Sequence, residues 1–171
     1  MKTNNSKKGF TLIELVLYVG IASGILLVST LFLQTLLESR VKNQTIAEVE
    51  QQGLQVMHLI AQTVRNAENI TSPTIGGSAG SLTLDVVNIV DDPTVFYVSG
   101  DSIQMTEGAG STIALTNSHV AASALTFQNL SRPDTPGIVR VSFILTHVNS
   151  SGRQEYEFSK TFYASASLRH P

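Results

Sequence analysis

The sequence predicts an α+β fold in which one long N-terminal helix is followed by a small antiparallel β-sheet. Three observations support this: an uncharged apolar run from Leu15 to Leu37, helical periodicity beyond Glu38, and short alternating runs after residue 81. The chain of 171 residues suits one domain with an appendage. Charged residues make up 14%, against about 25% in a usual soluble domain, so part of the chain is unusually apolar.

The apolar run is long enough to cross a membrane. Its 23 residues would form a helix of about 35 Å, against a hydrocarbon core of about 30 Å. Lys2, Lys7 and Lys8 precede the run, with no acidic residue before Glu14, which favours a cytoplasmic N-terminus. A cleaved secretory signal is the alternative, but the run exceeds the usual core of about 7–15 residues. We therefore expect a spanning helix over residues 10–37.

Residues 38–70 are predicted to continue the same helix with one amphipathic face. No proline precedes Pro73, and Gly53 is the one glycine between Glu38 and Ile70. Apolar and small residues recur at steps of three and four: Ile46, Val49, Gly53, Met57, Ile60, Val64 and Ala67. A Gly/Ser-rich loop is expected over residues 71–81.

Residues 82–171 are predicted to form the antiparallel sheet. Alternation begins at Leu82, and Gly100-Asp101 separates two short apolar runs as a hairpin turn would. Two longer runs, residues 138–148 and 154–164, flank a second turn at residues 149–152. A sheet with one apolar face needs a cover, so we expect the amphipathic face of residues 46–67 to pack against it.

Glu14 is a carboxylate directly before the uncharged run and inside the predicted spanning helix over residues 10–37. A charge in mid-membrane costs about 2.5–3.5 kcal/mol and less near an end, so an intramembrane Glu suggests a functional partner. The simpler interpretation is that Glu14 reaches the headgroups. The residues around it decide between the two.

The stretch Lys7-Lys8-Gly9-Phe10-Thr11-Leu12-Ile13-Glu14-Leu15 closely resembles the N-terminus of the type IV prepilin and pseudopilin superfamily. The resemblance implies a pilin-like fold and a basic leader over residues 1–9 that ends in Lys7 and Lys8. It also implies cleavage by a prepilin peptidase after Gly9, N-methylation of Phe10, and pairing of Glu14 with a neighbouring subunit's amino terminus. The closing segment, residues 158–169, looks like the last strands of J-type minor pseudopilins and minor pilins.

The resemblance further implies a structural role. Its partners would be other pilin or pseudopilin subunits, the peptidase, assembly-platform membrane proteins, and membrane lipid before assembly. The chain would cross the inner membrane once, with its head outside, and then enter a filament in the periplasm or at the cell surface. A tip or initiator role in secretion or pilus assembly is expected, with no catalytic residue, cofactor or metal.

Two glycines in the run, Gly20 and Gly24, form a G-x-x-x-G pair. Small residues at this spacing let helices approach closely in lipid, so the pair suggests packing between subunits. Glycine is also simply common in membrane helices, and the sequence leaves the two interpretations open. Many major pilins carry a proline in this helix, whereas this span has none.

Other chemistries find weak support. The absence of Cys excludes disulfides and thiolate sites. Ser78 fits a G-x-S-x-G pattern, but with a helix before and a strand after, the reverse of a nucleophile elbow. The four histidines lack zinc spacing, and Asp91-Asp92-Pro93 suits a turn better than a Ca²⁺ site.

Loss of three leader lysines leaves 8 basic against 13 acidic side chains, which opposes direct nucleic-acid binding. A permanently anchored binding module is the main competing function, and a tethered hydrolase the least favoured.

Overall fold

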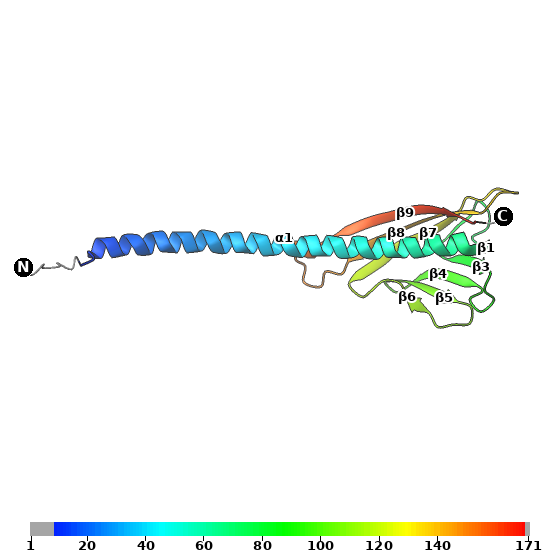
Figure 1. The fold of residues 1–171 in the computed structure, drawn as a ribbon, viewed down its shortest axis with the longest axis horizontal. Helices are drawn as coiled ribbons and strands as arrows, with labels where there is room; N and C mark the ends of the chain where they lie inside the picture. Colours follow the sequence, from blue (N-terminus) through cyan, green and yellow to red (C-terminus); the bar gives the residue numbers. More distant parts are fainter. Residues whose placement is uncertain (1–8, 170–171) are drawn as a thin grey trace, which may run out of the picture. The chain divides into compact units, whose positions relative to one another are not determined.

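The computed structural model describes residues 9–169. It contains one long helix, α1 (Leu12–Asn66), followed by antiparallel β-strands (Figure 1). The chain divides into two compact units at Arg40 and Val41. The first holds the apolar part of α1. The second, called the head here, holds the rest of α1 and all the strands. The predicted α+β class is therefore confirmed in outline.

The head contains two antiparallel sheets rather than the single sheet expected. The first has the order β1-β3-β4-β5-β6, and the second β2-β7-β8-β9. The strands of the first sheet are β1 (Ala67–Ser72), β3 (Leu82–Val86), β4 (Thr94–Ser99), β5 (Ser102–Glu107) and β6 (Ile113–Ala114). Those of the second are β2 (Ser78–Ala79), β7 (Val120–Asn129), β8 (Ile138–His147) and β9 (Ser159–Ser167).

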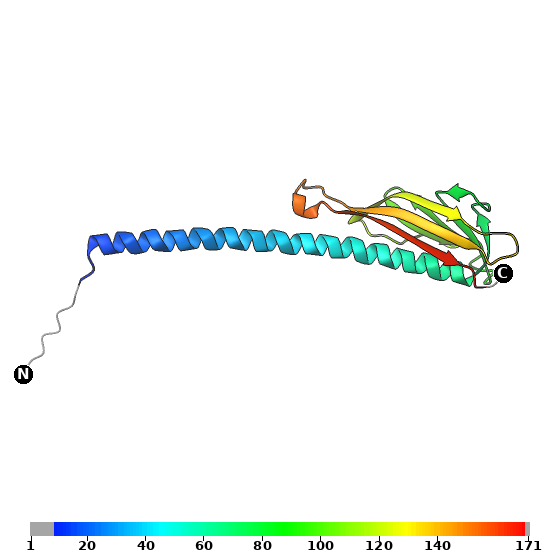
Figure 2. The ribbon, with the colours of Figure 1, turned by 90° about the horizontal axis from the view of Figure 1, so that it is seen from above.

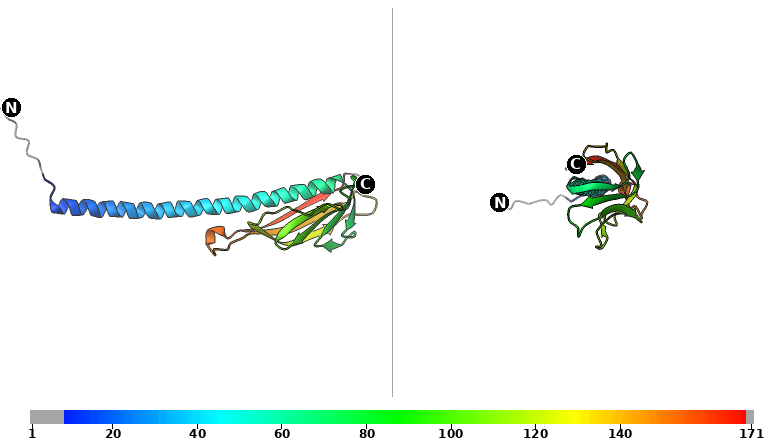
Figure 3. Two further views of the ribbon diagram at one scale, coloured as in Figure 1. Left: turned by 90° about the horizontal axis from the view of Figure 1, so that it is seen from below. Right: turned by 90° about the vertical axis from the view of Figure 1, so that its right-hand side faces the viewer.

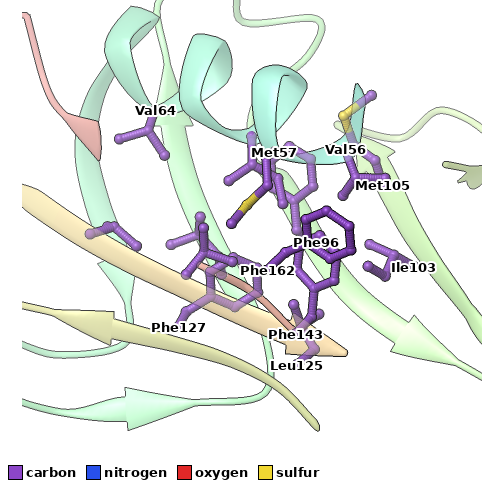
Figure 4. Close-up of a cluster of buried hydrophobic side chains, with 14 of the residues drawn as sticks. Val56, Met57, Val64, Phe96, Ile103, Met105, Leu125, Phe127, Phe143 and Phe162 are labelled. Carbon is purple, nitrogen blue, oxygen red and sulfur yellow. The ribbon is translucent and has the colours of Figure 1, made fainter. Parts of the chain in front are cut away.

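The core of the head lies between the two sheets and one face of α1. Figure 3, right, shows the head end-on, with strands on more than one side of the helix. In Figure 4, Val56, Met57 and Val64 point from α1 toward aromatic side chains of both sheets. Phe96, Phe127 and Phe143 are fully buried. The expected cover is confirmed, with the buried helix positions Thr45, Val49, Gly53, Val56, Met57, Ile60 and Val64.

Helix α1 ends at Asn66, four residues before the predicted end at Ile70. Ala67 begins β1, which pairs with β3 from the Ala67–Val86 partners onward. Ala67 fits the apolar periodicity of the helix and is buried, but its backbone is in a strand. The periodicity reports burial, and a burial pattern alone does not separate the last turn of a helix from a strand that continues into the same core.

Three further strands, β2, β6 and β7, were not predicted from the sequence pattern. Ser78 and Ala79 of the expected loop form β2, which pairs with Gln128 and Phe127 of β7. Strand β7 itself was not predicted. Its register shifts between Ser123 and Thr126, where Ala124 has a φ of 53°. This β-bulge breaks the alternation of apolar residues that marks a strand.

The connection between β8 and β9 is longer than the turn predicted. Residues 154–156 form a short 3₁₀ helix, η1 (Gln154–Tyr156), and β9 starts at Ser159. Lys42 of α1 donates hydrogen bonds to the carbonyl oxygens of Gln154 and Glu157, at 3.3 and 2.9 Å. The loop is thereby fastened to the helix, and β9 runs beside β8 (Figure 2).

Gly53 marks the closest approach of α1 to β9, and it yields a prediction. A Cβ at Gly53 would overlap the ring of Phe162, which stacks on Phe143 at a centroid distance of 5.4 Å. Overpacking costs about 1–3 kcal/mol, whereas Gly to Ala in a helix gains about 1 kcal/mol. We expect Gly53→Ala to lower the melting temperature of the head by about 3–5 °C. In a Phe162→Leu background the same change should be neutral or stabilising, and equal losses in both backgrounds would contradict this packing.

Candidate functional site

The segment that carries the predicted cleavage and assembly residues forms the start of α1. Gly9, Phe10 and Glu14 are exposed, whereas Lys7 and Lys8 lie outside the described residues. The N–H of Glu14 donates to the carbonyl oxygen of Thr11 at 3.1 Å and lies 3.4 Å from its hydroxyl oxygen. Thr11 is thus the N-cap of α1, and Glu14 is the third helical residue.

This geometry gives Glu14 a local role that the sequence analysis missed. Thr-x-x-Glu is the sequence pattern of a capping box, of which the structure forms the half made by the Thr11 hydroxyl, and a carboxylate at this position interacts favourably with the helix dipole. Both roles are compatible with assembly chemistry. Among residues 9–169, no cationic side chain forms an ion pair with Glu14.

The apolar part of α1 presents its side chains outward on every face. Leu12, Leu26 and Val28 are each more than three-fifths exposed. The hydroxyls of Ser23, Thr30 and Thr35 donate to helix carbonyl oxygens three or four residues earlier, at 2.8–2.9 Å. These polar groups are therefore satisfied without water. The helix meets the length and hydropathy of a membrane span.

The two glycines of the apolar part lie at open positions. A Cβ added at Gly20 or Gly24 would have no neighbour within 4 Å. No described part of this chain uses the close approach that they allow, so the choice between packing with another helix and ordinary membrane-helix composition stays a prediction.

A second polar site lies in the head, around Glu48 of α1. One carboxylate oxygen lies 2.8 Å from Nδ1 of His119 and 3.1 Å from Nδ2 of Asn117. The other lies 3.8 Å from Nε2 of His147, whose ring stacks on Tyr156 at 5.8 Å between centroids. We call these five residues the Glu48 cluster. It joins α1 to the segment before β7, to the end of β8 and to η1.

The electrostatics of the Glu48 cluster favour the ionised carboxylate. Burial alone would raise the pKa of Glu48, but hydrogen bonds from Asn117 and His119 and the nearby His119 and His147 charges lower the pKa below its ordinary value. The side chain of His147 is 11% exposed and that of His119 is 67% exposed. No motif or periodicity indicates this cluster, because its members are spread from residue 48 to residue 156 of the chain.

The remaining candidate chemistry finds no built site. Ser78 lies in β2, which is followed by strand β3 and not by the helix that an elbow requires. Asp91 accepts a hydrogen bond from Asn88 at 2.6 Å, and Asp92 accepts one from the N–H of Val86 at 3.3 Å, so both serve the local turn. Within residues 9–169, no group of three or more His, Asp or Glu residues is arranged to hold a metal ion.

A hollow of the head lies at the end of α1. It has a volume of about 860 Å³ and is lined by Leu59 and Thr63 of α1 and by residues from β3 to β5. Its charged side chains are of both signs: Arg65, Glu68, Asp91, Glu107 and Arg169. This mixture selects no ligand class, so the hollow adds no binding function.

Comparison with known protein families, with curated proteins and with solved structures finds no match to this chain.

The Glu48 cluster predicts a pH-dependent contribution to stability. Because the pKa of Glu48 is lowered in the folded head, its contribution is complete above the ordinary carboxyl range and is lost as the pH falls through the folded pKa. We expect Glu48→Ala to destabilise the head by about 1 kcal/mol at pH 7, measured by thermal unfolding. The difference from the natural chain should shrink as the pH falls below about 4.

The matched control for this experiment is Glu68→Ala, which removes an exposed acid without a described ion pair. Its stability difference should be small and nearly independent of pH. A constant loss for Glu48→Ala from pH 7 to pH 3 would show that the carboxylate charge contributes nothing.

Proposed function

We propose that this chain is a subunit of a type IV pilus-like filament, a minor pilin or pseudopilin that is stored in the membrane and then assembled. The observation that carries the proposal is the segment Gly9-Phe10-Thr11-Leu12-Ile13-Glu14, which leads directly into an apolar helix with exposed side chains. Cleavage after Gly9 by a prepilin peptidase and N-methylation of Phe10 belong to the same proposal.

The exposed apolar side chains of α1 need an apolar environment both before and after assembly. The apolar side chains from Leu12 to Leu37 are covered by no described part of their own chain, and their exposure to water would be strongly unfavourable. Lipid covers them before assembly. Neighbouring helices cover them in a filament, so extraction from the membrane need not expose them to water. Gly20 and Gly24 would permit close helix approach there.

Pairing between Glu14 and a new amino terminus would set the register of assembly. Cleavage creates an ammonium group at Phe10, and Glu14 lies four residues further on, about 6 Å along a helix axis. An incoming subunit offset along the axis could place its ammonium group against the Glu14 of its neighbour. Leaving one partner of a buried pair unpaired costs about 3–5 kcal/mol, so misaligned subunits would be rejected.

Features of the head favour a minor filament subunit over a major one. The closing segment resembles minor pseudopilins, and the absence of Cys removes the disulfide-bounded loop of many major pilins. After cleavage the chain carries 8 basic and 13 acidic side chains, which disfavours nucleic acid as a direct partner. We therefore assign a tip or initiator position, with sibling subunits and the assembly platform as partners.

Mass spectrometry of the chain purified from membranes of cells with a prepilin peptidase tests the processing step. We expect a mature chain that begins at N-methylated Phe10, and we expect Gly9→Val to retain the leader because the cut site is lost. A natural chain that keeps all nine leader residues would contradict the proposal and would fit a permanently anchored binding module.

A pair of substitutions separates the two roles of Glu14. The Thr11 cap uses the backbone N–H of residue 14, so Glu14→Gln keeps the helix start and removes the charge. We expect this variant to insert and to be cleaved, with its incorporation into filaments reduced at least about tenfold. Thr11→Val removes the capping hydroxyl but keeps the carboxylate, and should assemble nearly normally. Normal incorporation of Glu14→Gln, measured by immunoblotting of sheared filaments, would exclude the pairing.

A further inference from the structure

Strand β9 forms a long and regular edge of the second sheet that pairs with no further strand among the described residues. Its nine residues pair with β8 in one continuous register without a bulge. The other three sheet edges are short or irregular: β2 and β6 have two residues each, and β1 has two register shifts. Short or bulged edges discourage pairing with other chains. Strand β9 also has no proline, and its one charged residue is Lys160.

The hydrogen-bond pattern shows which backbone groups of β9 are free. The N–H of His147 donates to the carbonyl oxygen of Phe158, and the N–H of Leu168 donates to that of Gly137. In an antiparallel pair, hydrogen-bonded positions alternate with positions that point away. The even-numbered residues of β9 therefore face β8. The N–H and C=O groups that face outward belong to Ser159, Thr161, Tyr163, Ser165 and Ser167.

Exposed apolar side chains flank this edge on both faces of the sheet. On the outer face, Tyr163 is 77% exposed. On the inner face, Glu50 of α1 bonds to Lys160 of β9, and the Phe162 ring lies against Gly53. Leu54 follows Glu50 by four residues, so helical periodicity puts it on the same side of α1 as Glu50. Leu54 is 64% exposed. A strand added to β9 would thus place alternate side chains over Leu54 and over Tyr163.

We propose that the β9 edge binds an extended, uncharged segment of a different polypeptide by β-strand addition, with aliphatic residues at alternate positions. The outward-facing backbone groups supply the hydrogen bonds, and Leu54 supplies the apolar contact. The outward side chains of β9 are hydroxyl-bearing and uncharged, so they select no charged partner.

A second copy of this chain is disfavoured at the edge in the antiparallel orientation. Lys160 lies by Glu50 and Phe162 by Gly53, so β9 runs in the same direction as the head part of α1. Antiparallel pairing of two β9 strands would point the two helices in opposite directions. Two chains whose α1 helices begin in the same membrane cannot orient their helices in opposite directions. This exclusion of an antiparallel pair rests on the proposed function.

The test uses the full ¹⁵N-labelled chain in detergent micelles and needs neither cleavage nor filaments. The probe is a seven-residue peptide of alternating Thr and Val, acetylated and amidated. Without the peptide, the amides of Thr161, Tyr163 and Ser165 should exchange with deuterium about tenfold faster than those of Phe162 and Ala164. Saturating peptide should slow the three fast amides about tenfold or more.

Two variants with matched readouts complete the test. Ser165→Pro removes an outward N–H without removing a bond to β8, so it should keep the fold and abolish peptide protection. Leu54→Gln should weaken peptide binding about fivefold or more, whereas Ile75→Gln, at a similarly exposed aliphatic residue of the β1–β2 connection, should not.

Two outcomes would overturn the inference. One is the absence of protection, or protection away from β9, in the natural chain at saturating peptide. The other is protection that rises with protein concentration without peptide, together with a dimer mass in native mass spectrometry, which would assign the edge to a second copy. If Ser165→Pro fails to fold, the Leu54→Gln and Ile75→Gln comparison still decides, since equal peptide binding by those two variants would also overturn it.

Discussion

The structure depends on one constraint: helix α1 is apolar over most of its length, but the β-sheets bury side chains only from Thr45 to Val64 among its described residues. The hydrophobic effect acts on both parts alike, so the part before Arg40 needs a cover from outside its own chain. Lipid or neighbouring helices can supply that cover. The division of the chain into two compact units follows from this difference.

Within the head, close packing and polar contacts fix α1 against the sheets in different ways. Gly53 lets the helix approach until the Phe162 ring lies against its backbone, and a larger residue there would separate helix and sheet. The Glu48 cluster holds the same helix from its polar side and joins it to the ends of β7 and β8. The stability contributed by the Glu48 cluster depends on charge, whereas the stability contributed by the hydrophobic core does not.

Glu14 illustrates how one residue serves local structure and assembly together. Glu14 lies in the first turn of α1, where its carboxylate interacts favourably with the helix dipole. Cleavage after Gly9 would then add a positive charge four residues away in sequence. A charge that stabilises a helix start is available for pairing with another subunit, because the cap uses the backbone N–H of Glu14 and leaves its carboxylate free.

The sequence by itself determined the apolar helix, its amphipathic continuation, the Gly100-Asp101 hairpin and the face that covers the sheets, since each rests on local periodicity or turn chemistry. The cleavage and assembly roles of Gly9, Phe10 and Glu14 are also sequence inferences, and no contact between described residues bears on them. Tertiary structure decided the split into two sheets, strand β7 with its bulge, the Glu48 cluster and the free edge of β9. These features depend on which distant strands pair, and strand pairing is set by long-range packing that leaves no periodic trace in the chain.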